Sequence, residues 1–204
     1  MAAIALADIT GLVLAGGRGS RMGGMDKGLQ PFRGQPLALH ALQRLAPQTR
    51  QLLVNANRHA ADYATWGYPV VADAAPDFAG PLAGMLAGLQ HCRTGWLVTV
   101  PCDSPLFPLD LVARLAAAAP HGMAVVAARA DATATPRLQP VFCLMAARLA
   151  PALADYLARG GRKVGEWAAQ QEAVRVPFGP PQDAPLAFAN ANTLEELAAL
   201  EAAS

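Results

Sequence analysis

The stretch from Leu12 to Gly28, LVLAGGRGSRMGGMDKG, governs how the rest of the chain is interpreted. Its first four residues form an apolar run, which predicts a buried β-strand. Five glycines follow within nine residues, and three cations accompany them: Arg18, Arg21 and Lys27. Glycine reaches backbone conformations with positive φ and lets an anion approach main-chain N–H groups closely. A strand that ends in such a cationic loop therefore predicts a phosphate-binding site.

Two familiar phosphate-binding motifs do not fit this stretch. A Walker A loop needs a lysine followed by Ser or Thr, whereas Lys27 is followed by Gly28. The dinucleotide-binding fingerprint G-x-G-x-x-G is matched by Gly17 and Gly19, but Met22 occupies the third glycine position. A surface loop without a ligand is disfavoured, because ordering so many glycines costs conformational entropy that something usually offsets.

Length, charge and cysteine usage limit the class of protein. The chain has 204 residues, 53% of them hydrophobic, and a formal net charge of +1. These values predict one domain with a large core and give no sign of a nucleic-acid or membrane partner. The cysteines Cys92, Cys102 and Cys143 form no C-x-x-C pair and are expected to be reduced, buried thiols. We expect a cytoplasmic protein, because no apolar run reaches the ~18 residues that a membrane span needs and no signal peptide is recognisable.

Strand and helix patterns alternate along almost the whole chain. After the first strand, further strands are expected near 51–54, 70–72, 96–100, 123–127, 138–144 and 173–176. Helices are expected near 36–46, 58–66, 80–92, 109–118, 146–158 and 164–171. Pro140 indicates a bulge or an edge position, and Thr193 with Glu196 forms a capping box for a final helix. The order predicts an α/β fold: a single-domain, Rossmann-like three-layer sandwich with a mostly parallel sheet.

Polar features follow four of the expected strands. The glycine-rich loop, Asn55, Asp73 and Asp103 each come just after a strand. In open α/β sheets, ligands bind outside the carboxyl ends of the strands, near the point where the strand order reverses. We therefore expect these four features to converge on one crevice.

Asp103 is the sharpest single candidate. It lies in the sequence PCDSP (101–105), directly after an apolar strand. A carboxylate on a turn stiffened by prolines suits Mg²⁺, a hard cation that prefers oxygen ligands. The alternative is an N-cap for the helix near Leu109, but Asp103 lies several residues too early for it. Lys27 and Arg21 are expected to neutralise a triphosphate and the charge that develops during its transfer.

Other candidates have structural alternatives that the sequence leaves open. Asp73 suits a contact with ribose or guanine, or an ordinary turn before Pro76. Asn57 is expected to cap the next helix. Arg162 and Lys163 either meet a phosphate or stabilise the end of a helix.

Together these motifs resemble the molybdenum cofactor guanylyltransferases, a branch of the enzymes that join a nucleoside triphosphate to a phosphorylated acceptor. The doubled glycine Gly16-Gly17 is typical of this branch, whereas related cytidylyltransferases and sugar-phosphate enzymes more often carry Ala-Ala-Gly. The helix start at Gly80, Pro81 and Gly84 matches as well, and it either approaches the nucleotide or only packs. The matching segments span nearly the whole chain: L-A-G-G-x-x-S-R-M-G-x-x-x-K, V-N-A-N, D…G-P-L-A-G, P-C-D-S-P and N-A-N-T.

The resemblance implies transfer of GMP from GTP to the phosphate of molybdenum-bound molybdopterin, which yields the guanine dinucleotide cofactor and pyrophosphate. It implies Mg²⁺ as cofactor, with Asp103 as the metal ligand, and a catalytic set of Arg21, Lys27 and Asp103. Asn190 and Asn192 are assigned to the acceptor, so the nucleotide-binding part covers about 10–105 and the acceptor-binding part about 106–204. The nucleotide-binding residues carried over by position are Leu14, Ala15, Gly16, Lys27, Asn55, Asp73 and Asp103.

The resemblance also implies protein partners, namely molybdenum cofactor biosynthesis proteins and molybdoenzyme chaperones. Two alternative functions remain. One is a related cytidylyltransferase or sugar-phosphate nucleotidylyltransferase, which the Gly16-Gly17 pair disfavours. The other is a nucleotide-binding module without catalysis, which the presence of Asp103 and Lys27 disfavours.

Overall fold

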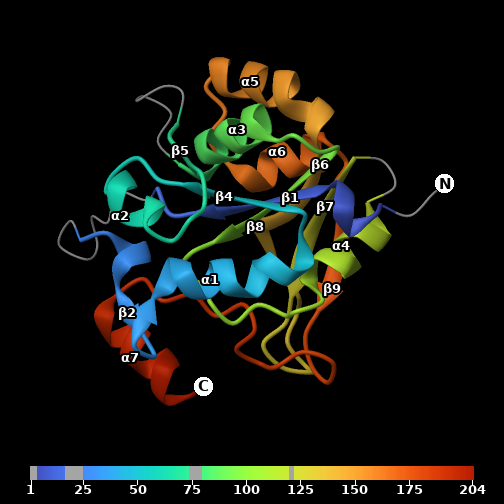
Figure 1. The fold of residues 1–204 in the computed structure, drawn as a ribbon. Helices are drawn as coiled ribbons and strands as arrows, with labels where there is room; N and C mark the ends of the chain where they lie inside the picture. The colour runs from blue at the N-terminus through green and yellow to red at the C-terminus, as the bar shows by residue number, and fades with distance from the viewer. Residues whose placement is uncertain (1–3, 17–24, 74–79, 120–121) are drawn as a thin grey trace.

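A seven-stranded sheet with the order β5-β4-β1-β6-β8-β7-β9 forms the centre of the computed structural model (Figure 1), which describes residues 4–16, 25–73, 80–119 and 122–204. All of its strands run parallel except β8, which pairs antiparallel with both β6 and β7. The predicted mostly parallel α/β sheet is therefore confirmed. Its strands are β1 (Ile9–Leu14), β4 (Gln51–Asn55), β5 (Val70–Val71), β6 (Trp96–Pro101), β7 (Met123–Ala128), β8 (Arg137–Ala146) and β9 (Val174–Phe178).

Helices cover both faces of this sheet and complete the three layers (Figure 1). One face carries α3 (Pro81–His91), α5 (Ala150–Ala158) and α6 (Val164–Gln170). The other carries α1 (Leu37–Leu45) and α4 (Leu111–Ala118). Outside the layers lie α2 (Ala60–Ala64), α7 (Leu194–Ala202) and a hairpin of β2 (Pro31–Phe32) and β3 (Gln35–Pro36). In the described ranges, no helix combines the length and apolarity that crossing a bilayer requires.

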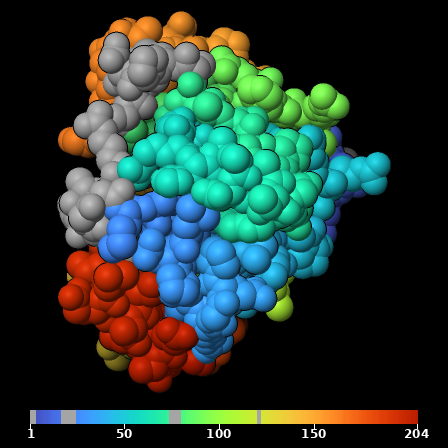
Figure 2. Space-filling view, turned by 60° about the vertical axis from the view of Figure 1, so that its left-hand side comes forward, coloured from blue at the N-terminus to red at the C-terminus, as the bar shows by residue number. Residues whose placement is uncertain are grey.

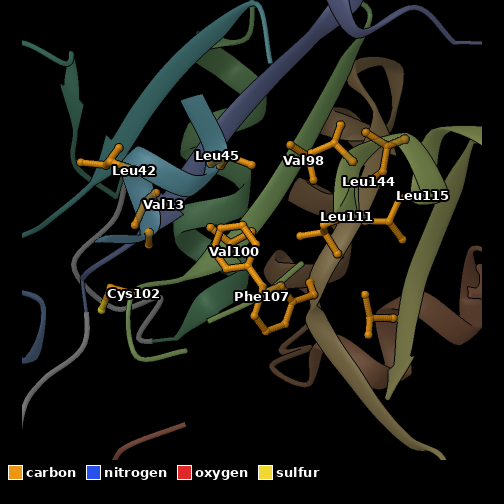
Figure 3. Close-up of a cluster of buried hydrophobic side chains, with 14 of the residues drawn as sticks. Val13, Leu42, Leu45, Val98, Val100, Cys102, Phe107, Leu111, Leu115 and Leu144 are labelled. Atoms are coloured by element: carbon orange, nitrogen blue, oxygen red, sulfur yellow. The ribbon is translucent and has the colours of Figure 1, made fainter. Parts of the chain in front are cut away.

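Strand β1 shows why the molecule has two hydrophobic cores. Side chains alternate between the faces of a strand, and all six residues of β1 are buried. Ile9 and Val13 join the cluster beneath α1 and α4, while Leu12 and Leu14 join the cluster beneath α3, α5 and α6. A continuous apolar run is thus the expected pattern for a parallel strand covered on both faces. Figure 3 shows part of the first cluster, with Val13, Leu42, Val98, Leu111 and Leu144 from five different elements.

Pro140 lies in a β-bulge of an interior strand. The pairing of β7 with β8 shifts between Val125 and Val126, whose partners are Cys143 and Gln139. Proline cannot donate to a ladder, so a bulge is where a sheet tolerates it. The bulge prediction is confirmed, and the edge alternative is wrong because β8 lies between β6 and β7.

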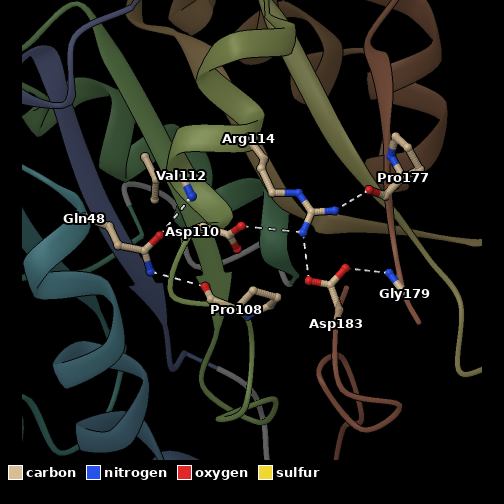
Figure 4. Close-up of polar contacts among 8 residues, drawn as sticks. All are labelled: Gln48, Pro108, Asp110, Val112, Arg114, Pro177, Gly179 and Asp183. Atoms are coloured by element: carbon tan, nitrogen blue, oxygen red, sulfur yellow. Dashed lines mark hydrogen bonds and ion pairs between the residues drawn. The ribbon is translucent and has the colours of Figure 1, made fainter. Parts of the chain in front are cut away.

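Arg114 ties α4 to the end of β9 and the turn that follows (Figure 4). Its guanidinium donates to the Asp183 carboxylate and to the Pro177 carbonyl, each at 2.7 Å, and lies 3.6 Å from the centroid of the Phe178 ring. Asp183 is buried and also accepts from the Gly179 backbone N–H at 2.7 Å. These bonds hold the C-terminal part of the chain in place as it leaves the sheet.

Candidate active site

The carboxyl ends of β1, β4, β5 and β6 lie along one edge of the sheet. From β1 the chain passes to β4 and β5 on one side, and it then crosses to β6 on the other side. The strand order therefore reverses between β1 and β6, which is the usual ligand-binding position of such sheets. The candidate residues after these strands form two groups at this edge, one around Lys27 and one around Asn55.

Lys27 and Asp103 meet across the switch point. The Lys27 Nζ donates to Oδ2 of Asp103 at 2.7 Å and to Oδ1 of Asn192 at 3.0 Å. The Lys27 and Asp103 side chains are 18% and 23% exposed, so the ion pair remains within reach of a ligand. The alternative role of Asp103 as a helix cap is wrong, because α4 begins at Leu111 with Asp110 at its N-cap position. The two residues predicted to handle phosphates and metal are thus adjacent.

Asn192 reaches this pair from the C-terminal segment. The backbone N–H of Ala191 donates to the Asp103 carbonyl at 3.1 Å, and the N–H of Asn192 donates to Oε2 of Glu196 at 2.6 Å. The predicted cap by Thr193 is confirmed at the start of α7, because Thr193 Oγ1 accepts from the Glu196 N–H at 3.1 Å, whereas the Glu196 carboxylate bonds Asn192 and not the N-cap residue. Figure 2 shows this segment (red) lying against the early segment that carries Lys27 (blue).

The two asparagines assigned to the acceptor therefore have different surroundings. Asn190 is exposed, whereas Asn192 is half-buried and contacts Lys27. Sequence reasoning did not identify the contact between Lys27 and Asn192, because 165 residues separate the two and no local pattern links them.

Asn55, Asn57 and Asp73 form the second group. The Asn55 amide donates to the Val71 carbonyl at 3.2 Å and to Oδ1 of Asp73 at 2.9 Å. Asn57 pairs with Asp73 twice: its amide donates to Oδ2 at 2.8 Å, and its carbonyl oxygen accepts from the Asp73 N–H at 2.8 Å. The predicted helix-capping role of Asn57 is wrong, because α2 has His59 at its N-cap position and no side-chain cap. Asp73 is thus held in one orientation by two amides.

Glycines allow neighbouring segments to pack closely against Asn55 and Asn57. A Cβ on Gly16 would lie 3.1 Å from Asn55 Oδ1 and 3.1 Å from Asn57 Nδ2. A Cβ on Gly84 of α3 would collide with Asn55 Oδ1 and approach Leu14 Cδ2 to 2.7 Å. Close packing by the Gly84 helix start is therefore observed, and it is directed at a candidate nucleotide-binding residue.

The main chain of Leu14 and Ala15 extends the sheet towards the candidate site. The Leu14 carbonyl accepts from the Cys102 N–H at 3.1 Å, and the Ala15 N–H donates to the Asn55 carbonyl at 2.9 Å. These bonds bring the ends of β1, β4 and β6 into register. Arg21, together with most of the glycine-rich loop, lies outside the described residues, so its predicted catalytic role concerns a part of the chain that the structure does not describe.

Asp26 and Tyr63 form a buried contact that sequence reasoning missed. The Tyr63 hydroxyl donates to Oδ1 of Asp26 at 2.6 Å, and the same oxygen accepts from the Gly28 N–H at 3.0 Å. Burial and the bond to Asp26 raise the pKa of Tyr63 far above its usual value, so its hydroxyl stays protonated. The available signal was the position of Asp26 directly before Lys27.

Arg162 follows the C-terminal end of α5, whereas Lys163 occupies the N-cap position of α6, which is not the helix C-terminus that favours a cation. The Arg162 guanidinium donates to the Leu157 carbonyl at 2.9 Å near the end of α5, which agrees with the helix-end interpretation. Lys163 is exposed and its ammonium donates to Oε1 of Glu166 at 2.8 Å, and this hydrogen bond raises the pKa of the lysine.

The three thiols are unpaired. Cys102 and Cys143 are buried, which raises the pKa of both thiols, whereas Cys92 is half-buried. Within the described ranges, no three His, Cys, Asp or Glu side chains gather to hold a metal ion. Asp103 is the described carboxylate that forms an ion pair with Lys27.

Solved structures with this fold include several nucleotidyltransferases. A molybdopterin-guanine dinucleotide biosynthesis protein A from Archaeoglobus fulgidus superposes with a TM-score of 0.69 at 20% identity, covering 95% of this chain and 97% of that one. A 4-diphosphocytidyl-2C-methyl-D-erythritol synthase from Anaerococcus prevotii superposes with a TM-score of 0.74 at 10% identity, covering 97% and 96%. At such identities the likeness concerns the fold.

Sequence comparison is more specific. Residues 11–176 match the family model described as the MobA-like NTP transferase domain. A molybdenum cofactor guanylyltransferase from Cupriavidus metallidurans is 59% identical over 192 residues, which covers 93% of each chain. A protein of the same name from Acidovorax sp. is 56% identical over 201 residues, covering 95% of each chain. Since the family model covers most of the chain and these relatives are more than half identical along nearly its whole length, the chain belongs to the family of the MobA-like molybdenum cofactor guanylyltransferases.

Proposed function

We propose that the protein transfers GMP from GTP to the terminal phosphate of molybdenum-bound molybdopterin, forming the guanine dinucleotide cofactor and pyrophosphate. Membership of the family supports this reaction. The observation that carries it is the Lys27 ammonium held between Asp103 and Asn192 at the switch point of the sheet. A fixed cation at that point suits a ligand with several phosphates. It also suits a reaction in which negative charge develops on a departing phosphate group.

The chemistry is a direct displacement at phosphorus. An oxygen of the acceptor phosphate attacks the α-phosphorus of GTP, the bond from that phosphorus to the β-phosphate oxygen breaks, and its electron pair leaves with pyrophosphate. The attacking oxygen is already anionic at neutral pH, so no general base is needed. Lys27 and Arg21 are proposed to stabilise the departing pyrophosphate, and positioning with electrostatics supplies most of the acceleration.

The donor set at Asp103 fits a magnesium ion. Oδ1 of Asp103 accepts a long bond of 3.3 Å from the Ser104 hydroxyl, so it keeps lone pairs for a cation. Mg²⁺ is typically held by one or two carboxylates together with substrate phosphates and water. When bound, such an ion would neutralise triphosphate charge beside Lys27.

We propose that the guanosine lies against the group formed by Asn55, Asn57 and Asp73. Asn55 and Asp73 would contact the base or ribose, and the main chain at Leu14, Ala15 and Gly16 would approach the nucleotide. On this proposal residues of about 10–105 bind the nucleotide and residues of about 106–204 face the acceptor, with Asn190 exposed there.

Cellular context follows as part of the same proposal. The acceptor must be delivered and the product collected, which gives molybdenum cofactor biosynthesis proteins and molybdoenzyme chaperones as partners. A cytoplasmic location agrees with the three unpaired thiols.

Pyrophosphate release tests the function directly. The purified protein is offered GTP, CTP, ATP and UTP separately with Mg²⁺, with and without molybdenum-loaded molybdopterin. Release with GTP that depends on the pterin is expected. Release with CTP instead would move the protein to the cytidylyl branch. Binding of GTP without any release would support a module without catalysis.

A further inference from the structure

Buried hydrogen bonds to Asp26 lie next to Lys27. The turn that carries this lysine (Lys27–Leu29) begins after Asp26, whose Oδ1 accepts from the Gly28 N–H at 3.0 Å. The Asp26 main-chain carbonyl accepts from the Gln30 side-chain amide at 2.9 Å. Both bonds stay within five residues of sequence, so by themselves they fix the shape of the turn and not its place in the molecule.

Tyr63 supplies a side-chain bond that ties the turn to a helix distant in sequence. It comes from α2, its side chain is fully buried, and its hydroxyl donates to Asp26 Oδ1 at 2.6 Å. The ring is held independently by edge-to-face packing on Trp66, with centroids 5.1 Å apart. A Cβ on Gly28 would collide with the Tyr63 hydroxyl, so the glycine allows this close approach. The hydroxyl thus joins a separately packed ring to the turn.

We infer that Tyr63 and Asp26 are positioning residues for Lys27. Their bond fixes the main chain from which the lysine side chain extends, and Asp103 and Asn192 fix the position of its ammonium group. The inference rests on the proposed function, in which Lys27 meets the phosphates of GTP. A carboxylate accepting a buried hydroxyl is a strong, directional contact in low dielectric. A shift of about 1 Å in a phosphate-binding cation is enough to cost roughly 100-fold in rate.

The geometry also connects the two residue groups of the site. Tyr63 lies six residues after Asn57, which bonds Asp73, and it belongs to the helix that comes next in the chain, α2. The same short segment therefore contacts the carboxylate on the nucleoside side and the turn on the phosphate side. Breaking the Tyr63 bond should release the phosphate side while leaving the bonds of Asn55 and Asn57 to Asp73 intact.

Substitution Tyr63→Phe removes the hydroxyl and keeps the ring. Its control is Tyr156→Phe, which removes the hydroxyl of another largely buried tyrosine. That hydroxyl is bonded to the Lys163 carbonyl at 3.3 Å and to Glu166 at 3.5 Å, on α5 and α6 and away from the Lys27 turn. GTP binding with Mg²⁺ is measured by titration calorimetry, and pyrophosphate release with the loaded pterin gives kcat and KM.

Tyr63→Phe is expected to weaken GTP binding about tenfold and to lower kcat by roughly 10- to 100-fold. Tyr156→Phe should leave both values within about twofold, although both variants lose some thermal stability. The decisive comparison is made with Lys27→Ala. If Tyr63 acts through Lys27, adding Tyr63→Phe to Lys27→Ala should weaken GTP binding by less than about twofold further, because the contact it positions is already gone.

Two results would overturn the inference. One is a Tyr63→Phe variant that binds GTP and turns over like Tyr156→Phe. The other is an equal loss of GTP affinity from Tyr63→Phe with and without Lys27, which would show a general effect on the fold. Failure of the unsubstituted protein to bind GTP would instead overturn the proposed function, and the calorimetric experiment separates that outcome from the others.

Discussion

Substitution of Gly84 by alanine should damage GTP binding far more than it damages folding. A Cβ at this position would collide with Asn55 Oδ1 and lie 2.7 Å from both Asn55 Cγ and Leu14 Cδ2. Asn55 must then move and lose its bonds to the Asp73 carboxylate and the Val71 carbonyl. A bond to a charged group contributes about 1.5–3 kcal/mol, so GTP affinity should fall at least about tenfold if this arrangement binds the nucleotide.

The cost to stability is smaller because two effects oppose each other. Overpacking a core position costs about 1–3 kcal/mol, whereas alanine in place of glycine inside a helix gains up to about 1 kcal/mol. Gly88 offers a matched control one turn further along α3. A Cβ there would meet Leu12 Cδ2 at 2.5 Å and Leu97 Cδ2 at 3.0 Å, which are the ends of apolar side chains away from Asn55.

The assay combines thermal denaturation with calorimetric titration of GTP in Mg²⁺. Gly84→Ala should remain folded and lose at least about tenfold in affinity, while Gly88→Ala should bind within about twofold of the unsubstituted protein. Normal affinity in Gly84→Ala would refute the reasoning that the position of Asn55 governs binding. An equal loss in both variants would assign the effect to distortion of α3.

Three further predictions follow from the site and the core. Asp103→Asn removes the charge partner of Lys27, so pyrophosphate release should fall by roughly 100-fold or more at saturating Mg²⁺, and release near the normal rate would contradict the assignment. Asn57→Ala removes both 2.8 Å bonds to Asp73, so calorimetry should show GTP binding weakened about tenfold with little change in melting temperature, since Asn57 is exposed. Burial raises the pKa of Cys143 to about 12 in the folded protein. As pH rises above about 9, this thiol therefore loses its proton in the unfolded chain while it stays protonated in the folded one. The free energy of unfolding should therefore fall with rising pH in that range by about 1.4 kcal/mol per pH unit for this thiol, and denaturant titrations of Cys143→Ala should show a correspondingly weaker decline.

The sequence was informative wherever a pattern was local. Apolar runs located the strands, and the alternation with helices gave a mostly parallel sheet, which the strand pairing confirms. Because the carboxyl ends of parallel strands share one edge, the positions of Asn55, Asp73 and Asp103 were enough to expect a common site. The antiparallel direction of β8 was not predictable in this way, because it depends on where the chain returns after β7 and not on the composition of the strand.

The contacts within the site depend on partners that are distant in sequence. Asn57 carries a typical capping residue type, yet it pairs with Asp73 because the end of β5 brings that carboxylate beside it. Tyr63 lies in a segment for which the sequence predicts only a short helix, and its bond to Asp26 depends on how α2 packs against the lysine turn. The sequence supplied the reactive groups, while the structure supplied the residues that hold them.

The site is completed late during synthesis of the chain, because Asn192 and helix α7 come after the last strand of the sheet. Residues Ala191, Leu197 and Leu200 share a hydrophobic cluster with Leu37 and with Phe32 of the hairpin that follows the lysine turn. During synthesis the sheet can be finished at β9, while Lys27 still lacks its partner Asn192. A nascent or C-terminally clipped chain is therefore expected to be folded but catalytically deficient. Turnover would then report that synthesis of the C-terminal segment is complete, and proteolysis of that segment would silence the protein without unfolding its sheet.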